Sequence, residues 1–90
     1  MSSVTASHIL VPTLTEAQEL LSQYKSGTPF EALALQHSKC PSGTNGGSLG
    51  NFNKGMMVKP FEDAAFALEV GQVSSPIQTQ FGYHLIKRYA

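Results

Sequence analysis

The chain has 90 residues, six basic and six acidic side chains, and a formal charge of zero. This length suits one domain, residues 1–90, with a single modest core, and the charge balance argues against nucleic-acid or membrane partners. No apolar run approaches the roughly 20 residues that span a bilayer, the first five residues lack the pattern of a secretory leader, and the lone Cys40 excludes an internal disulfide. We therefore expect a cytoplasmic protein, and we expect it to be a monomer.

The N-terminal part of the chain predicts a strand and then a helix. Residues 4–11 are an apolar run that Pro12 should end, because proline cannot donate to a strand ladder. Thr13 and Glu16 then have the spacing of a capping box. Apolar residues three and four apart follow in one helical stripe: Ala17, Leu20, Leu21 and Tyr24. Gly27 is a suitable end for this helix.

A second helix is expected directly afterwards. Thr28 and Glu31 suggest another capping box, with Pro29 at the first helical position. The stripe continues to about Ser38 through Phe30, Leu33, Ala34 and His37.

The rest of the chain predicts a loop, a strand, a helix and a closing hairpin. Residues 39–48 have loop composition, and a short strand over 49–52 follows. Pro60 should open a third helix that ends near Gly71, with Phe61, Ala64, Ala65 and Leu68 on its inner face. Residues 73–79, interrupted by Pro76, suggest an edge strand, and residues 83–89 the last strand. The order β-α-α-β-α-β-β predicts an α+β fold in which helices cover a small antiparallel sheet.

One histidine lies inside the apolar run at each end of the chain. Because strand side chains alternate faces, His8 shares a face with Leu10, and His84 shares one with Ile86. If the two strands are neighbours, the rings can share a hydrogen bond. The pattern fits a satisfied core pair, which we favour slightly on this ground alone, and it also fits a site.

Cys40 is the other group capable of chemistry. A nucleophilic thiol needs a neighbouring base, which His8 or His84 would supply only through the fold; the simpler interpretation is a small buried hydrophobe. His8, His37, Cys40 and His84 show none of the short paired spacings of zinc sites. The glycine-rich phosphate and dinucleotide patterns are absent. We therefore expect neither a metal nor a cofactor.

Met57 and Phe61 are four residues apart around Pro60. Such a pair is more often ordinary core. Here it follows a glycine-rich stretch, where a thioether and a ring can also form a pocket for an apolar guest.

Five segments, in this order and spacing, resemble the parvulin peptidyl-prolyl cis/trans isomerases, and the minimal single-domain parvulins in particular. They are Ser7-His8-Ile9-Leu10-Val11, Cys40-Pro41-Ser42-Gly43, Gly46-Gly47-Ser48-Leu49-Gly50, Met57-Val58-Lys59-Pro60-Phe61 and Phe81-Gly82-Tyr83-His84-Leu85-Ile86-Lys87. The resemblance covers essentially the whole chain.

This resemblance implies a four-stranded antiparallel sheet wrapped by helices and an isomerase that acts on proline-containing peptides and unfolded protein clients. It implies a catalytic group of His8, Cys40, Thr79 and His84. It also implies that Leu49, Met57 and Phe61 hold the substrate proline, with Phe81 as an aromatic wall and Ser42 on the rim. Since the family accepts cysteine or aspartate at the position of Cys40, the resemblance favours a non-covalent mechanism.

One departure bears on specificity. Phosphate-directed parvulins carry basic residues after the first strand, whereas residues 12–16 contain no Lys or Arg, and Phe81 stands where those enzymes tend to have a small polar residue. We therefore expect a phosphorylation-independent enzyme that accepts a neutral or apolar residue before proline. The alternatives are a non-catalytic peptide-binding or chaperone module that uses the same groove, and a thiol enzyme centred on Cys40.

Overall fold

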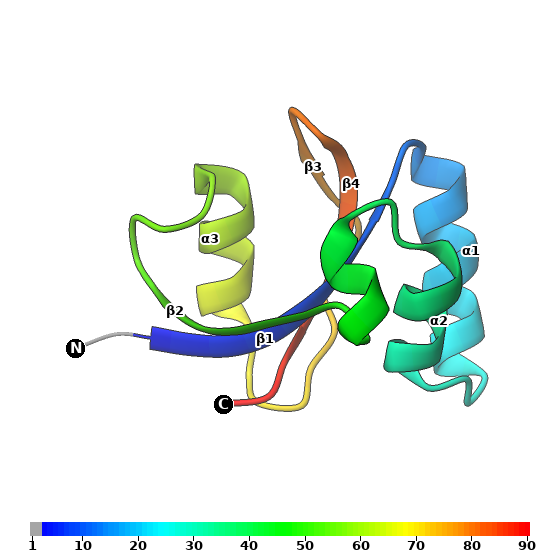
Figure 1. Ribbon diagram of the computed structural model, residues 1–90, viewed down its shortest axis with the longest axis horizontal. Helices are drawn as coiled ribbons and strands as arrows, with labels where there is room; N and C mark the ends of the chain where they lie inside the picture. The colour runs from blue at the N-terminus through cyan, green and yellow to red at the C-terminus, as the bar shows by residue number, and fades with distance from the viewer. Residues whose placement is uncertain (1–2) are drawn as a thin grey trace.

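The computed structural model describes residues 3–90, except for the side chain of Ser42, and its four antiparallel strands form one sheet between layers of helices (Figure 1). The elements are β1 Ser3–Val11, α1 Leu14–Lys25, α2 Phe30–His37, the 3-10 turn η1 Pro41–Asn45, β2 Ser48–Asn53, α3 Lys59–Ala67, β3 Ile77–Thr79 and β4 Gly82–Arg88. The strand order is β2-β1-β4-β3. The predicted α+β class and the order of elements are therefore confirmed, with η1 as an addition inside the predicted loop.

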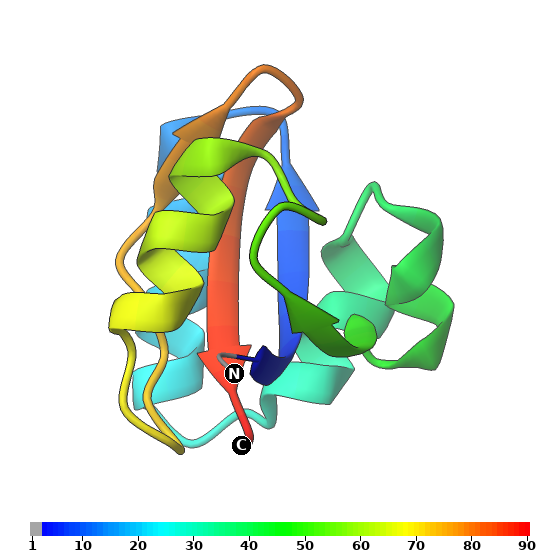
Figure 2. The ribbon, with the colours of Figure 1, turned by 90° about the vertical axis from the view of Figure 1, so that its left-hand side faces the viewer.

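The first and last strands of the chain are the two middle strands of the sheet. In Figure 2, β1 and β4 lie side by side behind α3. Their register pairs His8 with Ile86, Ile9 with Leu85 and Leu10 with His84. Because side chains alternate along each strand, neighbouring residues of β1 enter two different layers of the molecule.

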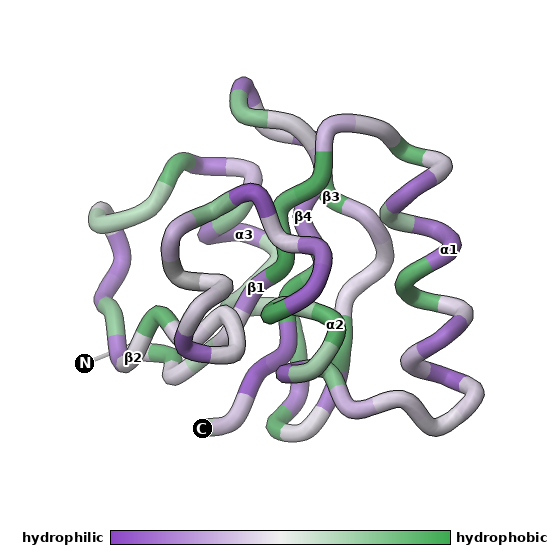
Figure 3. The backbone as a smooth tube through the Cα atoms, turned by 45° about the vertical axis from the view of Figure 1, so that its right-hand side comes forward, coloured by the Kyte–Doolittle hydropathy of each residue, from purple (hydrophilic) through white to green (hydrophobic). Residues whose placement is uncertain are grey.

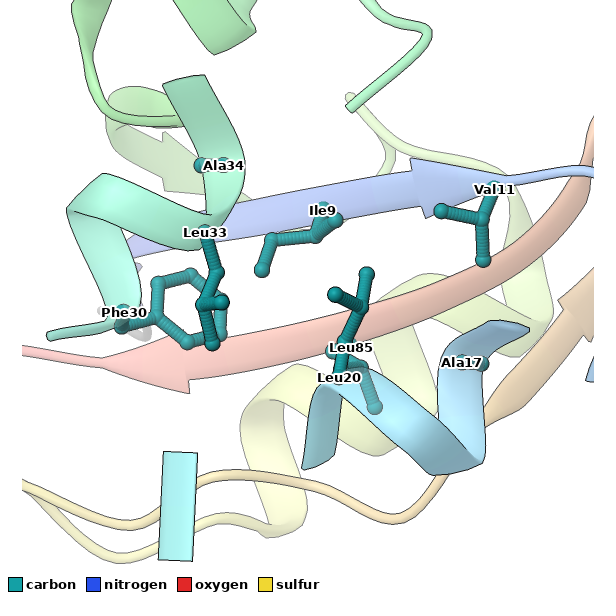
Figure 4. Close-up of a cluster of buried hydrophobic side chains, with 8 residues drawn as sticks. All are labelled: Ile9, Val11, Ala17, Leu20, Phe30, Leu33, Ala34 and Leu85. Carbon is teal, nitrogen blue, oxygen red and sulfur yellow. The ribbon is translucent and has the colours of Figure 1, made fainter. Parts of the chain in front are cut away.

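One face of the sheet is closed by α1 and α2. Figure 4 shows the side chains of Leu20 and Leu33 pointing from these helices toward Ile9 of β1 and Leu85 of β4. All the members of this cluster are buried and apolar: Ile9, Val11, Ala17, Leu20, Phe30, Leu33, Ala34 and Leu85. We call this the closed face.

The opposite face is covered by α3 and the loop that follows β2. Its buried apolar cluster consists of Val4, Ala6, Phe52, Phe61, Ala65, Leu68 and Ile86. His8 and His84 share this face through the strand register. We call it the site face.

The helix ends agree only partly with the sequence patterns. Figure 3 shows the alternation of hydrophobic and hydrophilic residues along α1, and the Thr13 side chain accepts the backbone N–H of Glu16 at 3.2 Å, as predicted. The second capping box is wrong, because Pro29 itself is the N-cap of α2 and no side chain caps that helix. With a ψ of 139°, Pro29 is extended, so α2 begins one residue later than predicted.

β1 and β2 are slightly longer than predicted, whereas two later elements differ more. α3 begins at Lys59, one residue before the predicted proline, and ends at Ala67, earlier than predicted. The edge position of β3 is confirmed, but this strand is limited to Ile77–Thr79, with a single bridge at Val73 before Pro76. Among residues 3–90, no helix has the length and apolar character required to cross a membrane.

Candidate active site

A hydrogen-bonded pair of histidines lies at the centre of the site face. The Nδ1 atoms of His8 and His84 are 3.0 Å apart, and the two rings stack with centroids 5.2 Å apart at 16°. Both residues are buried, with relative exposures of 5% and 4%. The predicted hydrogen bond between the rings is therefore confirmed, and one Nδ1 must carry the proton that the other accepts.

Thr79 extends this pair into a network. Its Oγ1 lies 2.8 Å from Nε2 of His84 and accepts the backbone N–H of Phe81 at 3.2 Å. The β3–β4 hairpin places Thr79 opposite Gly82, close to His84 on the neighbouring strand. When the hydroxyl donates to Nε2, His84 carries its proton on Nδ1 and donates it to His8.

Burial keeps the two rings neutral. Two causes lower the pKa of His8 to about 4: desolvation, which is the larger, and repulsion by a charged His84. Desolvation also lowers the pKa of His84 from 6.5. At neutral pH the pair therefore offers fixed hydrogen-bonding dipoles with no net charge.

Phe61 of α3 packs against both histidines. Its ring meets His8 at a centroid distance of 5.5 Å and an angle of 82°, and meets His84 at 5.2 Å and 83°. These edge-to-face contacts are favourable for aromatic rings. The Phe61 side chain is 3% exposed, so it anchors α3, and it also borders a cavity over the histidines.

A cavity of about 530 Å³ opens over the histidines. Its described lining residues are His8, Leu10, Lys39, Cys40, Pro41, Leu49, Met56, Met57, Val58, Phe61, Phe81 and His84. Most of these side chains are apolar, and the volume lies in the range of small-molecule and peptide-side-chain pockets. The cavity is therefore suited to an apolar group with limited hydrogen bonding.

Most residues predicted for the site come together here. The lining includes seven of them, namely His8, Cys40, Leu49, Met57, Phe61, Phe81 and His84. Thr79 is not a lining residue but lies behind His84, in the hydrogen bond already described. Ser42 belongs to η1, and its side chain lies outside the described part of the structure.

Five other described lining residues were not predicted for the site: Leu10, Lys39, Pro41, Met56 and Val58. Met56 and Val58 adjoin Met57, so their proximity to a predicted pocket residue was an available signal. Lys39 has the same signal, because it directly precedes Cys40. Its position depends on a contact with β1, in which its backbone N–H donates to the carbonyl oxygen of Leu10 at 2.7 Å.

The loop before β2 approaches His8 closely. His8 donates its backbone N–H to the carbonyl oxygen of Gly47 at 2.9 Å. Gly47 has a φ of 82°, and a Cβ atom on it would lie 2.2 Å from the His8 carbonyl oxygen. Only glycine fits this approach, which fixes the path of the chain from η1 into β2 beside the site.

Within residues 3–90, no cluster of three or more His, Cys, Asp or Glu side chains is arranged to hold a metal ion.

Fold and site together define a class of protein. Residues 8–90 match the family described as rotamase, or PPIC-type PPIase domain. The chain therefore belongs to the PPIC-type peptidyl-prolyl isomerases, the parvulins.

Relatives of two kinds illustrate this membership. The chain is 52% identical to the foldase protein PrsA of Geobacillus sp. (strain WCH70) over 85 residues. The aligned region covers 93% of this chain and 31% of that protein. The chain superposes on the solution structure of NmPin, the parvulin of Nitrosopumilus maritimus, with a TM-score of 0.91, 50% identity, and coverage of 100% of this chain and 98% of that one. A crystal structure of PrsA from Bacillus anthracis gives a TM-score of 0.96 at 44% identity, over 98% of this chain and 41% of that one.

The chain spans about a third of the length of the PrsA proteins that it matches. It corresponds to nearly all of the single-domain parvulin NmPin.

Proposed function

We propose that the cavity over the histidine pair binds the proline ring of a peptide and accelerates cis/trans isomerisation of the preceding bond. The observation that carries this proposal is the placement of Phe61 and two neutral, hydrogen-bonded histidines beneath a largely apolar cavity. Leu49, Met57 and Phe61 would hold the ring, and Phe81 would form a wall beside it. The substrates would be proline-containing peptides and unfolded or flexible protein segments.

The physical task is to stabilise a twisted amide. Rotation about the X–Pro bond must overcome a barrier of about 18–20 kcal/mol, because the planar form has partial double-bond character. A pocket that fixes the ring while the preceding carbonyl turns lets binding favour the twisted geometry over both planar states. Each tenfold acceleration requires about 1.4 kcal/mol of this differential stabilisation. No covalent bond to the substrate is needed.

In this mechanism the histidines form the rigid, polar floor of the cavity. Their lowered pKa values disfavour an imidazolium at neutral pH, so neither ring is suited to donate a proton to the amide nitrogen. Thr79 holds the orientation of His84. Cys40, on the cavity wall, would be a polar neighbour rather than a nucleophile.

Phosphorylation of the substrate would not be required. The connection between β1 and α1 consists of Pro12 and Thr13, which provide no cation for a phosphate. Phe81, which is 60% exposed, presents an apolar ring at the cavity. Both features support acceptance of a neutral or apolar residue before the proline.

The direct test is NMR exchange spectroscopy on Ala-Pro, Leu-Pro, Glu-Pro and phosphoserine-Pro peptides without a coupled protease. We expect enhanced cis/trans exchange for the unphosphorylated peptides and no gain from phosphoserine over glutamate. The absence of any enhancement at stoichiometric protein would refute isomerase activity. A phosphoserine peptide that is much faster than all others would refute phosphorylation independence alone.

A chaperone role is the second candidate. It is supported by the name foldase in the PrsA relatives and by a structure from Campylobacter jejuni, described as a SurA-like chaperone, with 42% identity over 98% of this chain and 38% of that one. Met56 and Phe81 also expose 64% and 60% of their surface beside the cavity. If chaperoning uses the cavity, Met57→Ala should weaken both isomerisation and suppression of aggregation. If Met57→Ala loses isomerisation but still suppresses aggregation, the chaperone activity uses another surface of the protein.

Cytoplasmic location and a monomeric state stay predictions. Immunodetection of the endogenous protein in cell fractions and sedimentation of the purified chain would test them.

A further inference from the structure

Lys39 is the only Lys, Arg, Asp or Glu among the described residues that line the cavity. The two histidines that share the lining have pKa values below their ordinary range, so they add no positive charge at neutral pH. A bound peptide therefore meets one cationic side chain beside an otherwise uncharged set of imidazole, thiol and apolar groups.

The backbone at Lys39 is firmly placed. Its N–H donates to the Leu10 carbonyl oxygen at 2.7 Å, and Ser38 Oγ accepts the N–H of Leu10 at 3.1 Å and of Cys40 at 3.4 Å. These bonds tie the segment after α2 to β1, next to His84 in the strand register. The side chain of Lys39 is exposed and lines the cavity, and its flexible stem lets the ammonium group reach the cavity mouth.

The ammonium group forms no ion pair within 4.0 Å with a carboxylate of the described residues. Across residues 3–90, the ion pair found within 4.0 Å is Lys59–Asp63 on α3. Glu16 and Glu19 line a second hollow, between α1 and α2, that Lys39 also borders, yet neither forms an ion pair with it. The charge of Lys39 is thus available to a bound peptide.

We propose that Lys39 determines substrate specificity by favouring a carboxylate side chain on a residue next to the proline. This inference rests on the proposed isomerase function and on the proline position assigned there. Adjacent Cα atoms are about 3.8 Å apart, so a residue flanking the bound proline lies at the cavity mouth. A single ammonium attracts a carboxylate as a point charge, whereas it lacks the bidentate geometry with which Arg clusters select phosphate.

The effect is expected to be moderate and sensitive to salt. An exposed charge acts through a high dielectric and is screened over about 10 Å at 0.1 M ionic strength. We expect glutamate peptides to exceed lysine peptides in kcat/KM by about three- to tenfold at low salt, with glutamine between them. The ratio should fall toward one at 1 M salt.

The experiment uses two peptide series, with Glu, Gln, Lys or phosphoserine either directly before or directly after the proline. Exchange rates are measured by NMR, and Kd values come from chemical-shift titrations of the same peptides. Lys39→Gln should remove the Glu-over-Lys preference, Lys39→Glu should reverse it, and Lys39→Arg should keep it. Lys25→Gln is the matched control, because Lys25 is the last residue of α1 and is not among the described cavity residues.

The outcomes separate this inference from the proposed function. Exchange enhancement with equal values for Glu and Lys peptides in both series would overturn the role of Lys39 and leave the isomerase intact. Binding that prefers Glu through Lys39, without any exchange enhancement, would support Lys39 and overturn the catalytic function. A preference that Lys39→Gln retains, or that Lys25→Gln also removes, would contradict the assignment to Lys39. If the kcat/KM of the phosphoserine peptide depends on Lys39 more strongly than that of the Glu peptide, the group that Lys39 prefers is a phosphate and not a carboxylate.

Discussion

The closed face and the site face are built from the same two strands, yet they differ in chemistry. Ile9 and Leu85 enter the closed face, where the buried cluster under α1 and α2 is entirely apolar. Their chain neighbours His8 and His84 enter the site face, where a titratable pair lies beside a cavity. The alternation of a strand thus separates a stabilising layer from a functional layer by a single residue step.

This difference divides stability from activity. Substitutions on the closed face should lower the free energy of unfolding and leave the chemistry of any surviving folded protein unchanged. On the site face, buried polar groups make stability depend on hydrogen bonds and pH.

Removing a large side chain from the closed face should have the greatest effect on stability. Phe30 is 1% exposed and packs edge-to-face with Tyr24. Phe30→Ala should lower the free energy of unfolding by about 3–5 kcal/mol, because it removes buried area and leaves a cavity. Urea denaturation measures this loss. The control is Leu35→Ala, on the exposed side of α2, which should change stability little. A loss below 1 kcal/mol for Phe30→Ala would show that the closed face is not the main stabilising layer.

The site face should make stability depend on pH. Unfolded histidine binds a proton near pH 6.5, whereas folded His8 does so only near pH 4. The unfolded state therefore binds more protons between these values, and the free energy of unfolding falls as the pH is lowered through this window. The full effect of His8 is about 3 kcal/mol, reached near pH 4.

Urea unfolding at several pH values from 7.5 to 5 would measure the upper part of this loss. That range avoids the titration of Glu31, whose pKa lies below its ordinary 4.5 mainly through its bond to Tyr89. Stability that stays constant from pH 7.5 to 5 would contradict the buried, neutral histidine pair.

Breaking the network should cost less than opening the closed face. His84→Ala removes the partner of the His8 Nδ1 atom and of Thr79 Oγ1. We expect a loss of about 1–3 kcal/mol, the cost of leaving buried polar groups unsatisfied. Thr79→Val removes the bond to His84 Nε2 and the bond from the Phe81 N–H, and it should cost less because Thr79 is less buried. Isomerisation rates of the variants must be compared at equal folded fraction. A His84→Ala protein with wild-type stability and wild-type exchange rate would show that the histidine pair contributes to neither.

The sequence predicted the layers better than the site. Alternation and spacing located every strand and α-helix but not the 3-10 turn η1, because burial on one face imposes its period on the residues of the longer elements. The start of α2 was misplaced because proline suits both an extended cap and a first helical turn, and local sequence does not distinguish them.

The site required contacts between distant parts of the chain. The meeting of His8 with His84 was predictable once β1 and β4 were assumed to be neighbours. Lys39 directly precedes the predicted Cys40, but its place in the cavity wall follows from a backbone bond to Leu10, 29 residues earlier in the chain. The periodic patterns of apolar residues that predict helices and strands do not predict a backbone hydrogen bond between distant residues.

The smallest predicted effect concerns Cys40. If it is a polar neighbour of the histidines, Cys40→Ala should retain part of the isomerase activity and Cys40→Asp should retain more. Exchange rates of the two folded variants measure this order. Total loss in both, with an unchanged fold, would favour a nucleophilic thiol.

The central claim is that the cavity of the site face is the place of catalysis. Its most direct test is NMR exchange on a Leu-Pro peptide with the wild-type chain, Met57→Ala in the cavity, and Leu35→Ala on the exposed surface of α2. We predict enhanced exchange for the wild type and Leu35→Ala, and a reduction of about tenfold, or 1.4 kcal/mol of transition-state stabilisation, for Met57→Ala. Wild-type exchange that is not enhanced, or a folded Met57→Ala protein with the wild-type rate, would contradict it.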